Sequence, residues 1–199
     1  MKQWIFNPFR YIAGAKSLAI GVLLMLALSV LCYFSDTYFS GALSAQYLTR
    51  NYMGMPYILH ICYLFSGWVI LSVIAYFAAR LMSKTPTRFI DMAGTLALSK
   101  APLLFFALMG FIPSIHIDID MNANMEQMMD GINSVIVPIL PLLFVSLVFV
   151  IWYIALMYNA YSTCSNLKGG KAVLSFIAVL IVAEVLVYIL GRNVISNLL

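Results

Sequence analysis

The chain has 199 residues, of which 64% are hydrophobic and 9% are charged, and its mean hydropathy is +1.00. Soluble domains carry about 45–50% apolar and about 25% charged residues, so this composition excludes an ordinary soluble domain. It indicates a polytopic membrane protein. The net charge of +4 comes from basic residues near the ends of apolar segments, which is typical of membrane topology and argues against a nucleic-acid-binding face.

Residues 1–16 mix aromatic and basic side chains, which is typical of a segment at the lipid headgroups. Residues 35–56 are polar with interspersed aromatic side chains. They predict either a short amphipathic helix on the surface or an irregular loop, and the spacing leaves both open. The remaining chain predicts an all-α, polytopic membrane helical bundle that forms a single domain, 1–199. Its five expected spans are residues 17–34, 57–82, 89–113, 135–159 and 172–190.

The basic residues predict the orientation of these spans. With the N-terminus in the cytoplasm and the C-terminus outside, most basic residues fall on the inner side, as the positive-inside rule requires. The inner segments then hold Lys2, Arg10, Lys16, Arg80, Lys84, Arg88, Lys168 and Lys171, and the outer segments hold Arg50 and Arg192.

Lys100 lies in the middle of the expected third span, where a charge costs about 2.5–3.5 kcal/mol on insertion scales. It must therefore be hydrated, paired or hidden. Pro102 follows two residues later and removes a backbone donor, and Ser99 precedes it by three residues. We therefore expect the third helix to be broken or kinked near Pro102.

Glu184 is the single charge in the expected fifth span. If both spans run outward, Lys100 and Glu184 each lie about 17 Å into the bilayer at about 1.5 Å per residue. Opposite charges at one depth are the simplest partners, so we expect the third and fifth helices to touch there.

Two interpretations of this intramembrane pair stay open. In one, Lys100 and Glu184 pin the register of two helices. In the other they form a proton- or ion-coupled site, and a polar stripe of Asp91, Thr95 and Ser99 leads inward from the cytoplasm.

Residues 114–134 form the longest loop and hold no lysine or arginine. His116, Asp118 and Asp120 alternate with isoleucine, so they share one edge of an extended segment and are weak candidates for a divalent cation. A solvated acidic loop explains the same residues. We therefore expect no metal and no cofactor.

Short motifs accompany the five spans along nearly the whole chain. They are Asn7-Pro8-Phe9, Ser99-x-x-Pro102, Trp152 with Tyr158-Asn159-Ala160, and Lys168-Gly169-Gly170-Lys171-Ala172. This layout resembles the Yip domain family of small integral membrane proteins. Eukaryotic members take part in membrane traffic and bind Rab-type GTPases, usually with a longer cytosolic N-terminal region. Without such a region, we expect a prokaryotic-type member in the bacterial inner (cytoplasmic) membrane and no GTPase partner.

The function implied by this resemblance is a non-enzymatic membrane-organising or protein-interaction component, whose partners are the lipid bilayer and other membrane proteins or a second copy. The alternative is a small ion- or proton-coupled transporter that uses Lys100 and Glu184. No serine–histidine–aspartate grouping, zinc-protease motif or pair of cytoplasmic carboxylates occurs in the sequence, so we do not expect an enzyme.

Overall fold

The computed structural model describes residues 7–47, 55–83, 85–116 and 125–198. The fold is mostly helical, and five helices are long and apolar enough to cross a membrane, which confirms the predicted five-span architecture. The elements are η1 (Pro8–Arg10), α2 (Ala15–Phe34), β1 (Thr37–Tyr38), β2 (Gln46–Tyr47), α3 (Tyr57–Met82), α4 (Phe89–Leu98), α5 (Leu103–Met109), η3 (Pro113–Ile115), α6 (Met125–Ser165) and α7 (Gly169–Leu198).

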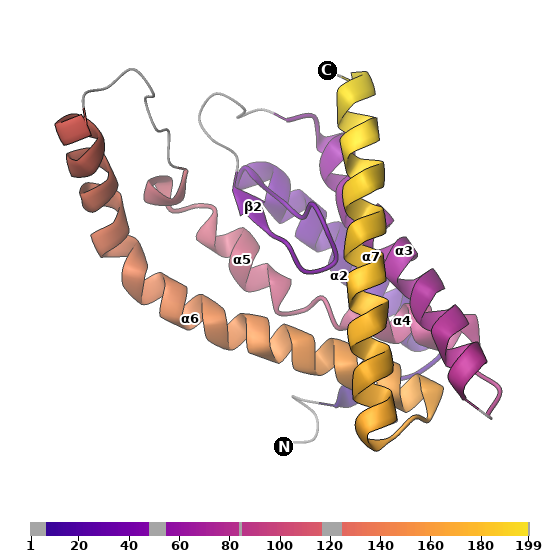
Figure 1. The fold of residues 1–199 in the computed structure, drawn as a ribbon. Helices are drawn as coiled ribbons and strands as arrows, with labels where there is room; N and C mark the ends of the chain where they lie inside the picture. Colours follow the sequence, from indigo (N-terminus) through magenta and orange to yellow (C-terminus); the bar gives the residue numbers. More distant parts are fainter. Residues whose placement is uncertain (1–6, 48–54, 84, 117–124, 199) are drawn as a thin grey trace.

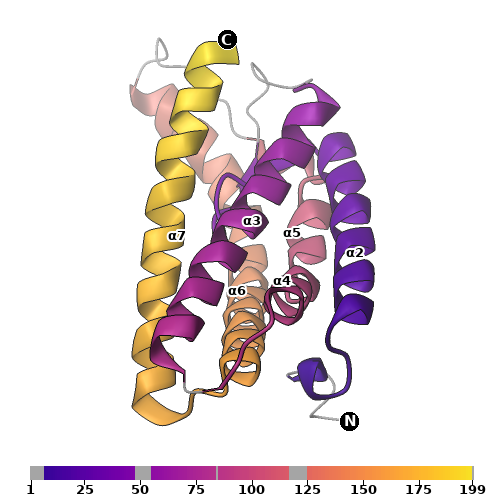
Figure 2. The same cartoon turned by 90° about the vertical axis from the view of Figure 1, so that its right-hand side faces the viewer.

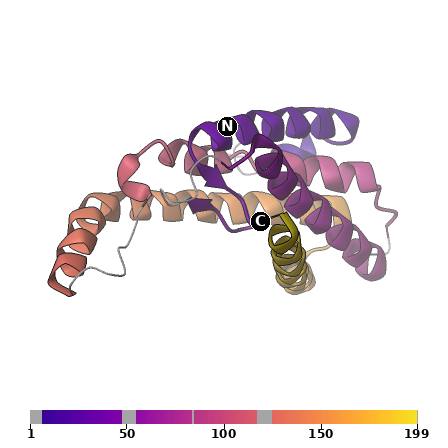
Figure 3. The ribbon, with the colours of Figure 1, turned by 90° about the horizontal axis from the view of Figure 1, so that it is seen from above.

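The helices pack as a bundle in which α2 lies on α4, and α3 contacts both α4 and α7. Viewed from above, α7 is seen almost end-on, whereas the long helix α6 crosses the width of the molecule (Figure 3). The two helices converge near the turn that joins them and diverge away from it (Figure 1). The hairpin β1–β2 and α5 are visible between them.

η1 and the last turn of α7 lie at opposite ends of the bundle (Figure 2). The start of α2, the end of α3 and the α6–α7 turn lie at the same end as η1 (Figure 2). The exposed basic side chains at this end are Lys16 at the start of α2, Arg80 near the end of α3, and Lys168 and Lys171 at the α6–α7 turn.

Small residues bring α2 and α4 into close contact. A Cβ atom on Gly21 would lie 2.5 Å from Ala97 Cβ and 2.8 Å from the Leu98 amide nitrogen. On the facing helix, a Cβ on Gly94 would overlap the Ser17 hydroxyl. Small residues leave room for the two backbones to approach. In lipid no hydrophobic force drives helices together, so this close van der Waals packing stabilises the contact. The two backbones therefore touch almost directly along the first two turns of α2.

The third span consists of α4 and α5, joined by a turn at residues 99–102. In the turn, the amides of Lys100 and Ala101 donate to the carbonyls of residues 97 and 98, at 3.2 and 3.3 Å. These are three-residue bonds rather than the four-residue bonds of an α-helix. The turn presents the Lys100 side chain to the interior of the bundle. A kink caused by Pro102 itself stays a prediction.

The segment after α2 forms a β-hairpin, in which Thr37 pairs with Tyr47 and Tyr38 with Gln46. The predicted amphipathic surface helix is therefore wrong for residues 37–47, and part of the segment is buried inside the bundle. Tyrosine and phenylalanine side chains at the base of the hairpin supply apolar surface that packs inward.

Candidate functional site

Lys100 is enclosed by the bundle and only 1% exposed. Its Nζ lies 3.5 Å from the hydroxyl of Tyr153 on α6, and 6.0 Å from the centre of that ring. The Tyr153 hydroxyl in turn donates to the carbonyl oxygen of Ala42, at 2.6 Å. The ammonium is therefore hidden in the protein, with a hydroxyl as its partner.

Glu184 is half-buried on α7 and faces the turn of the hairpin. Its Oε1 accepts a hydrogen bond of 2.5 Å from the amide of Leu43. A Cβ on Gly41 would overlap Glu184 Oε2, so glycine at this position lets the carboxylate approach the backbone. We call residues 40–44 the hairpin tip.

Lys100 and Glu184 are connected through Tyr153 and the hairpin tip. Among the residues that the structure describes, no ion pair of 4.0 Å or less joins the two side chains. α7 packs mainly on α3. The structure thus connects the two residues indirectly, and the intramembrane pairing of Lys100 with Glu184 stays a prediction. A functional role for the two residues stays a proposal.

The two hydroxyls of the predicted polar stripe, on Thr95 and Ser99, each donate to a carbonyl of their own helix. Thr95 is fully buried and donates to the Asp91 carbonyl at 2.8 Å, and its hydroxyl lies 3.3 Å from Cys164 Sγ. Ser99 is also fully buried and donates to the Leu96 carbonyl at 2.8 Å. Asp91 is half-buried at the start of α4. These hydrogen bonds satisfy the two hydroxyls within the helix.

Of the weak metal candidates, Asp118 and Asp120 lie outside the described residues. His116 is buried, and its Nε2 donates to the Gly110 carbonyl at 2.7 Å. Within the described residues, no cluster of three histidine, cysteine or acidic side chains could hold a metal ion. His116 therefore has a structural contact, which is the ordinary role of a buried histidine.

The base of the hairpin is tied to several helices. The Tyr47 hydroxyl donates to the Phe106 carbonyl at 3.2 Å, and burial, together with the nearby Cys32, raises the pKa of Tyr47 to about 12. The His60 ring, on α3, bonds to the Thr37 carbonyl at 3.0 Å. The Tyr38 and Tyr63 rings lie 5.5 Å apart. These contacts fix the base between α3 and α5.

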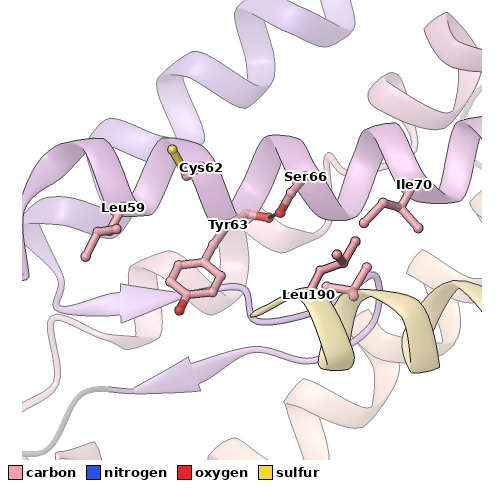
Figure 4. A pocket seen from close by; sticks show the side chains of 7 residues that line it. Leu59, Cys62, Tyr63, Ser66, Ile70 and Leu190 are labelled. Carbon is pink, nitrogen blue, oxygen red and sulfur yellow. Dashed lines mark hydrogen bonds between the residues drawn. The ribbon is translucent and has the colours of Figure 1, made fainter. Parts of the chain in front are cut away.

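A small pocket of about 100 Å³ lies between α3 and α7, beside the hairpin (Figure 4). Its lining is apolar except for Tyr63, Ser66 and the Cys62 thiol. A drug-sized ligand needs about 300 Å³ or more, so this pocket fits no substrate of ordinary size. It does not connect to Lys100, since neither Lys100 nor Tyr153 lines it.

Sequence reasoning missed Tyr153 and the hairpin tip. Tyr153 follows Trp152 in an apolar run, and a tyrosine there is a signal because its hydroxyl needs a partner when buried. A second signal was that five of the six residues from Ser40 to Ala45 are small, all except Leu43, because such a segment can enter a narrow space between helices. Which helices it enters depends on contacts far apart in the chain.

Searches among curated proteins and among solved structures find no significant match. The family model of the Yip1 domain matches residues 2–190, nearly the whole chain. The five candidate membrane helices agree with this match, because they lie within the matched region. This multi-pass membrane protein therefore belongs to the Yip1 domain family.

Proposed function

We propose that this protein is a non-enzymatic component that organises the membrane or binds other membrane proteins. The observation that carries the proposal is the enclosure of Lys100, which is 1% exposed and bonds to Tyr153, whose hydroxyl in turn donates to the hairpin tip. A carrier needs water to reach its ionisable site from each side in turn. A closed polar interior suits a protein that acts through its outer faces.

The outer faces of α6 and α7 support a role in contacts within the membrane. Both helices expose rows of large apolar side chains that lipid or a neighbouring membrane helix can cover. On α6 these include Leu143, Phe144, Leu147 and Ile151, and on α7 they include Leu174, Ile181, Val185 and Tyr188.

Site-specific photocrosslinking tests this role. A photoreactive amino acid at Leu147 or Leu174, both exposed, is expected to yield a discrete protein adduct in native membranes, identifiable by mass spectrometry. The same group at the buried Met157 is the matched control and should yield none. Lipid adducts alone at every exposed position of α6 and α7 would contradict the binding of other membrane proteins and favour a role in organising lipid.

We further propose that the N-terminus faces the cytoplasm of a bacterial cell and that the protein resides in its inner membrane. The exposed basic residues at the η1 end of the bundle support this orientation under the positive-inside rule. Labelling of intact cells with an impermeant thiol reagent tests it in a chain without its native cysteines. Gln46→Cys should react, and Lys168→Cys should react only after the cells are opened. The reverse pattern would invert the topology.

A second candidate function is an ion- or proton-coupled transporter. It is favoured by the hydrogen bonds that link Lys100 to Tyr153 and, through the hairpin tip, to Glu184. Ionisable residues inside a membrane protein often mark proton or ion pathways. Ion or proton flux in proteoliposomes tests this candidate. Flux that is present in the natural protein and lost in Lys100→Ala would favour the carrier and contradict the proposed interaction role.

A further inference from the structure

Three contacts hold the hairpin tip inside the bundle. On one side, the Leu43 amide bonds to Glu184, and on another the Ala42 carbonyl bonds to Tyr153. On the third side the Gly41 carbonyl packs on α3, where a Cβ on Gly67 would lie 3.1 Å away. The tip is therefore held by two hydrogen bonds and by a close approach of its backbone to Gly67.

The tip and the base of the hairpin are held differently. At the tip the buried apolar side chain is that of Ala42, whereas Leu43 is exposed. Burial of a single methyl group contributes little free energy. The base is anchored by Phe39, which is 3% exposed, and by the tyrosine contacts described above. The ladder between the strands is two residues long, too short to be stable without the surrounding helices. Loss of the polar contacts would therefore free the tip before the base.

Glu184 is in a position to control this release. It is half-buried, and its hydrogen bond with Leu43 is exposed at the surface of the bundle, whereas Lys100 is buried and is linked to the tip through the Tyr153 hydroxyl. We propose that the hairpin tip is a displaceable plug that Glu184 latches over Lys100. Breaking the Leu43–Glu184 bond lets the tip pivot on its anchored base and admits water to Lys100. This device goes beyond the proposed interaction role and does not depend on it.

Acylation of lysine by a membrane-impermeant sulfonated ester measures access to Lys100 in the full chain in lipid nanodiscs. Mass spectrometry reports each lysine separately, so the exposed Lys16 and Lys168 serve as internal controls that react in every sample. In the natural protein we expect Lys100 to react far more slowly than either. A Lys100 that reacts as fast as Lys168 would overturn the plug.

Two substitutions remove the latch by different routes. Glu184→Ala deletes the acceptor, and Gly41→Ala pushes the carboxylate away from Leu43. Each should speed the acylation of Lys100 about tenfold to a hundredfold, as the loss of one charge-assisted hydrogen bond predicts. Glu184→Gln keeps an acceptor oxygen and should cause a smaller increase. Gly170→Ala is the matched glycine control, because nothing lies within 4 Å of its added Cβ.

Folded Glu184→Ala and Gly41→Ala proteins in which Lys100 stays as protected as in the natural protein would overturn the proposal. If both variants fail to fold, hydrogen exchange in the natural protein decides. The plug predicts that amides of residues 41–44 exchange at least about tenfold faster than amides in the middle of α3 and α7. Equal protection of the tip and the helices would overturn it. Neither failure touches the interaction role, which the crosslinking at Leu147 and Leu174 tests separately.

Discussion

Different interactions stabilise the contact between α2 and α4 and the polar site around the hairpin tip. At the first, backbones meet through Gly21 and Gly94, and the nearby hydroxyl of Ser17 bonds to its own helix. At the second, side chains from α6 and α7 bond to the backbone of a loop that is remote in sequence. The comparison shows that close packing stabilises the α2–α4 contact, whereas a few hydrogen bonds stabilise the hairpin tip. The first should tolerate no added volume, and the second should respond to the loss of single polar groups.

Gly21→Leu is expected to have the largest effect, because its side chain has no space beside the α4 backbone. We expect the free energy of unfolding to fall by about 3 kcal/mol or more, measured in mixtures of mild detergent and dodecyl sulfate. Gly170→Leu adds the same volume where the space around the glycine is open and should change stability little. Equal stability of the two variants would show that α2 and α4 are not closely packed.

Tyr153→Phe should have the next largest effect, because it leaves the Ala42 carbonyl without its described donor and Lys100 without its hydroxyl partner. A loss of about 1–3 kcal/mol in unfolding free energy is expected. The matched control is Tyr161→Phe, another fully buried tyrosine, whose partner Ser175 keeps its bond to the Ala172 carbonyl. The control should cost about 1 kcal/mol or less. A larger loss in Tyr161→Phe would contradict the importance assigned to the hairpin tip.

Lys100→Met is expected to insert into the membrane and to change the unfolding free energy by less than about 1 kcal/mol, or to raise it. An apolar side chain of similar length replaces an ammonium that is costly to bury and whose described hydrogen bond is long, at 3.5 Å. Glu184→Gln should likewise insert. Failure of both proteins to insert or fold would restore the interpretation of the two charges as a register pin.

Ser99→Ala and Thr95→Val should have the smallest effects, below about 1 kcal/mol, because both hydroxyls bond to carbonyls of their own helix. Thermal unfolding measures this directly. In proteoliposomes these substitutions should leave any ion flux unchanged. A flux abolished by Ser99→Ala would show that the polar stripe leads to a transport site after all.

The fold was predictable from the sequence where the information is local. Long apolar runs indicated the five spans. The placement of Lys100 inside the bundle followed from the cost of burying a charge. What could not be predicted was the route from Lys100 to Glu184. Their matching depth suggested a direct contact, but depth along a helix says nothing about which segment lies between two helices.

The hairpin shows the same limit. Aromatic residues between the first two spans were compatible with a surface helix, and no periodicity in residues 37–47 contradicts it. The entry of the tip depends on Gly41 meeting Gly67 and Glu184, three residues from separate parts of the chain. Such coincidences of distant residues are decided by tertiary packing and leave no local signature.

A double-mutant cycle tests most directly whether the hairpin tip joins the Lys100 side of the bundle to Glu184. Tyr153→Phe and Glu184→Ala are measured singly and together, with Tyr161→Phe and Glu184→Ala as the control cycle. Because either substitution loosens the same loop, the double variant should lose less stability than the sum of the single losses, by about 0.5–3 kcal/mol. The control cycle should be additive. Additivity of Tyr153→Phe and Glu184→Ala within about 0.3 kcal/mol would contradict the account.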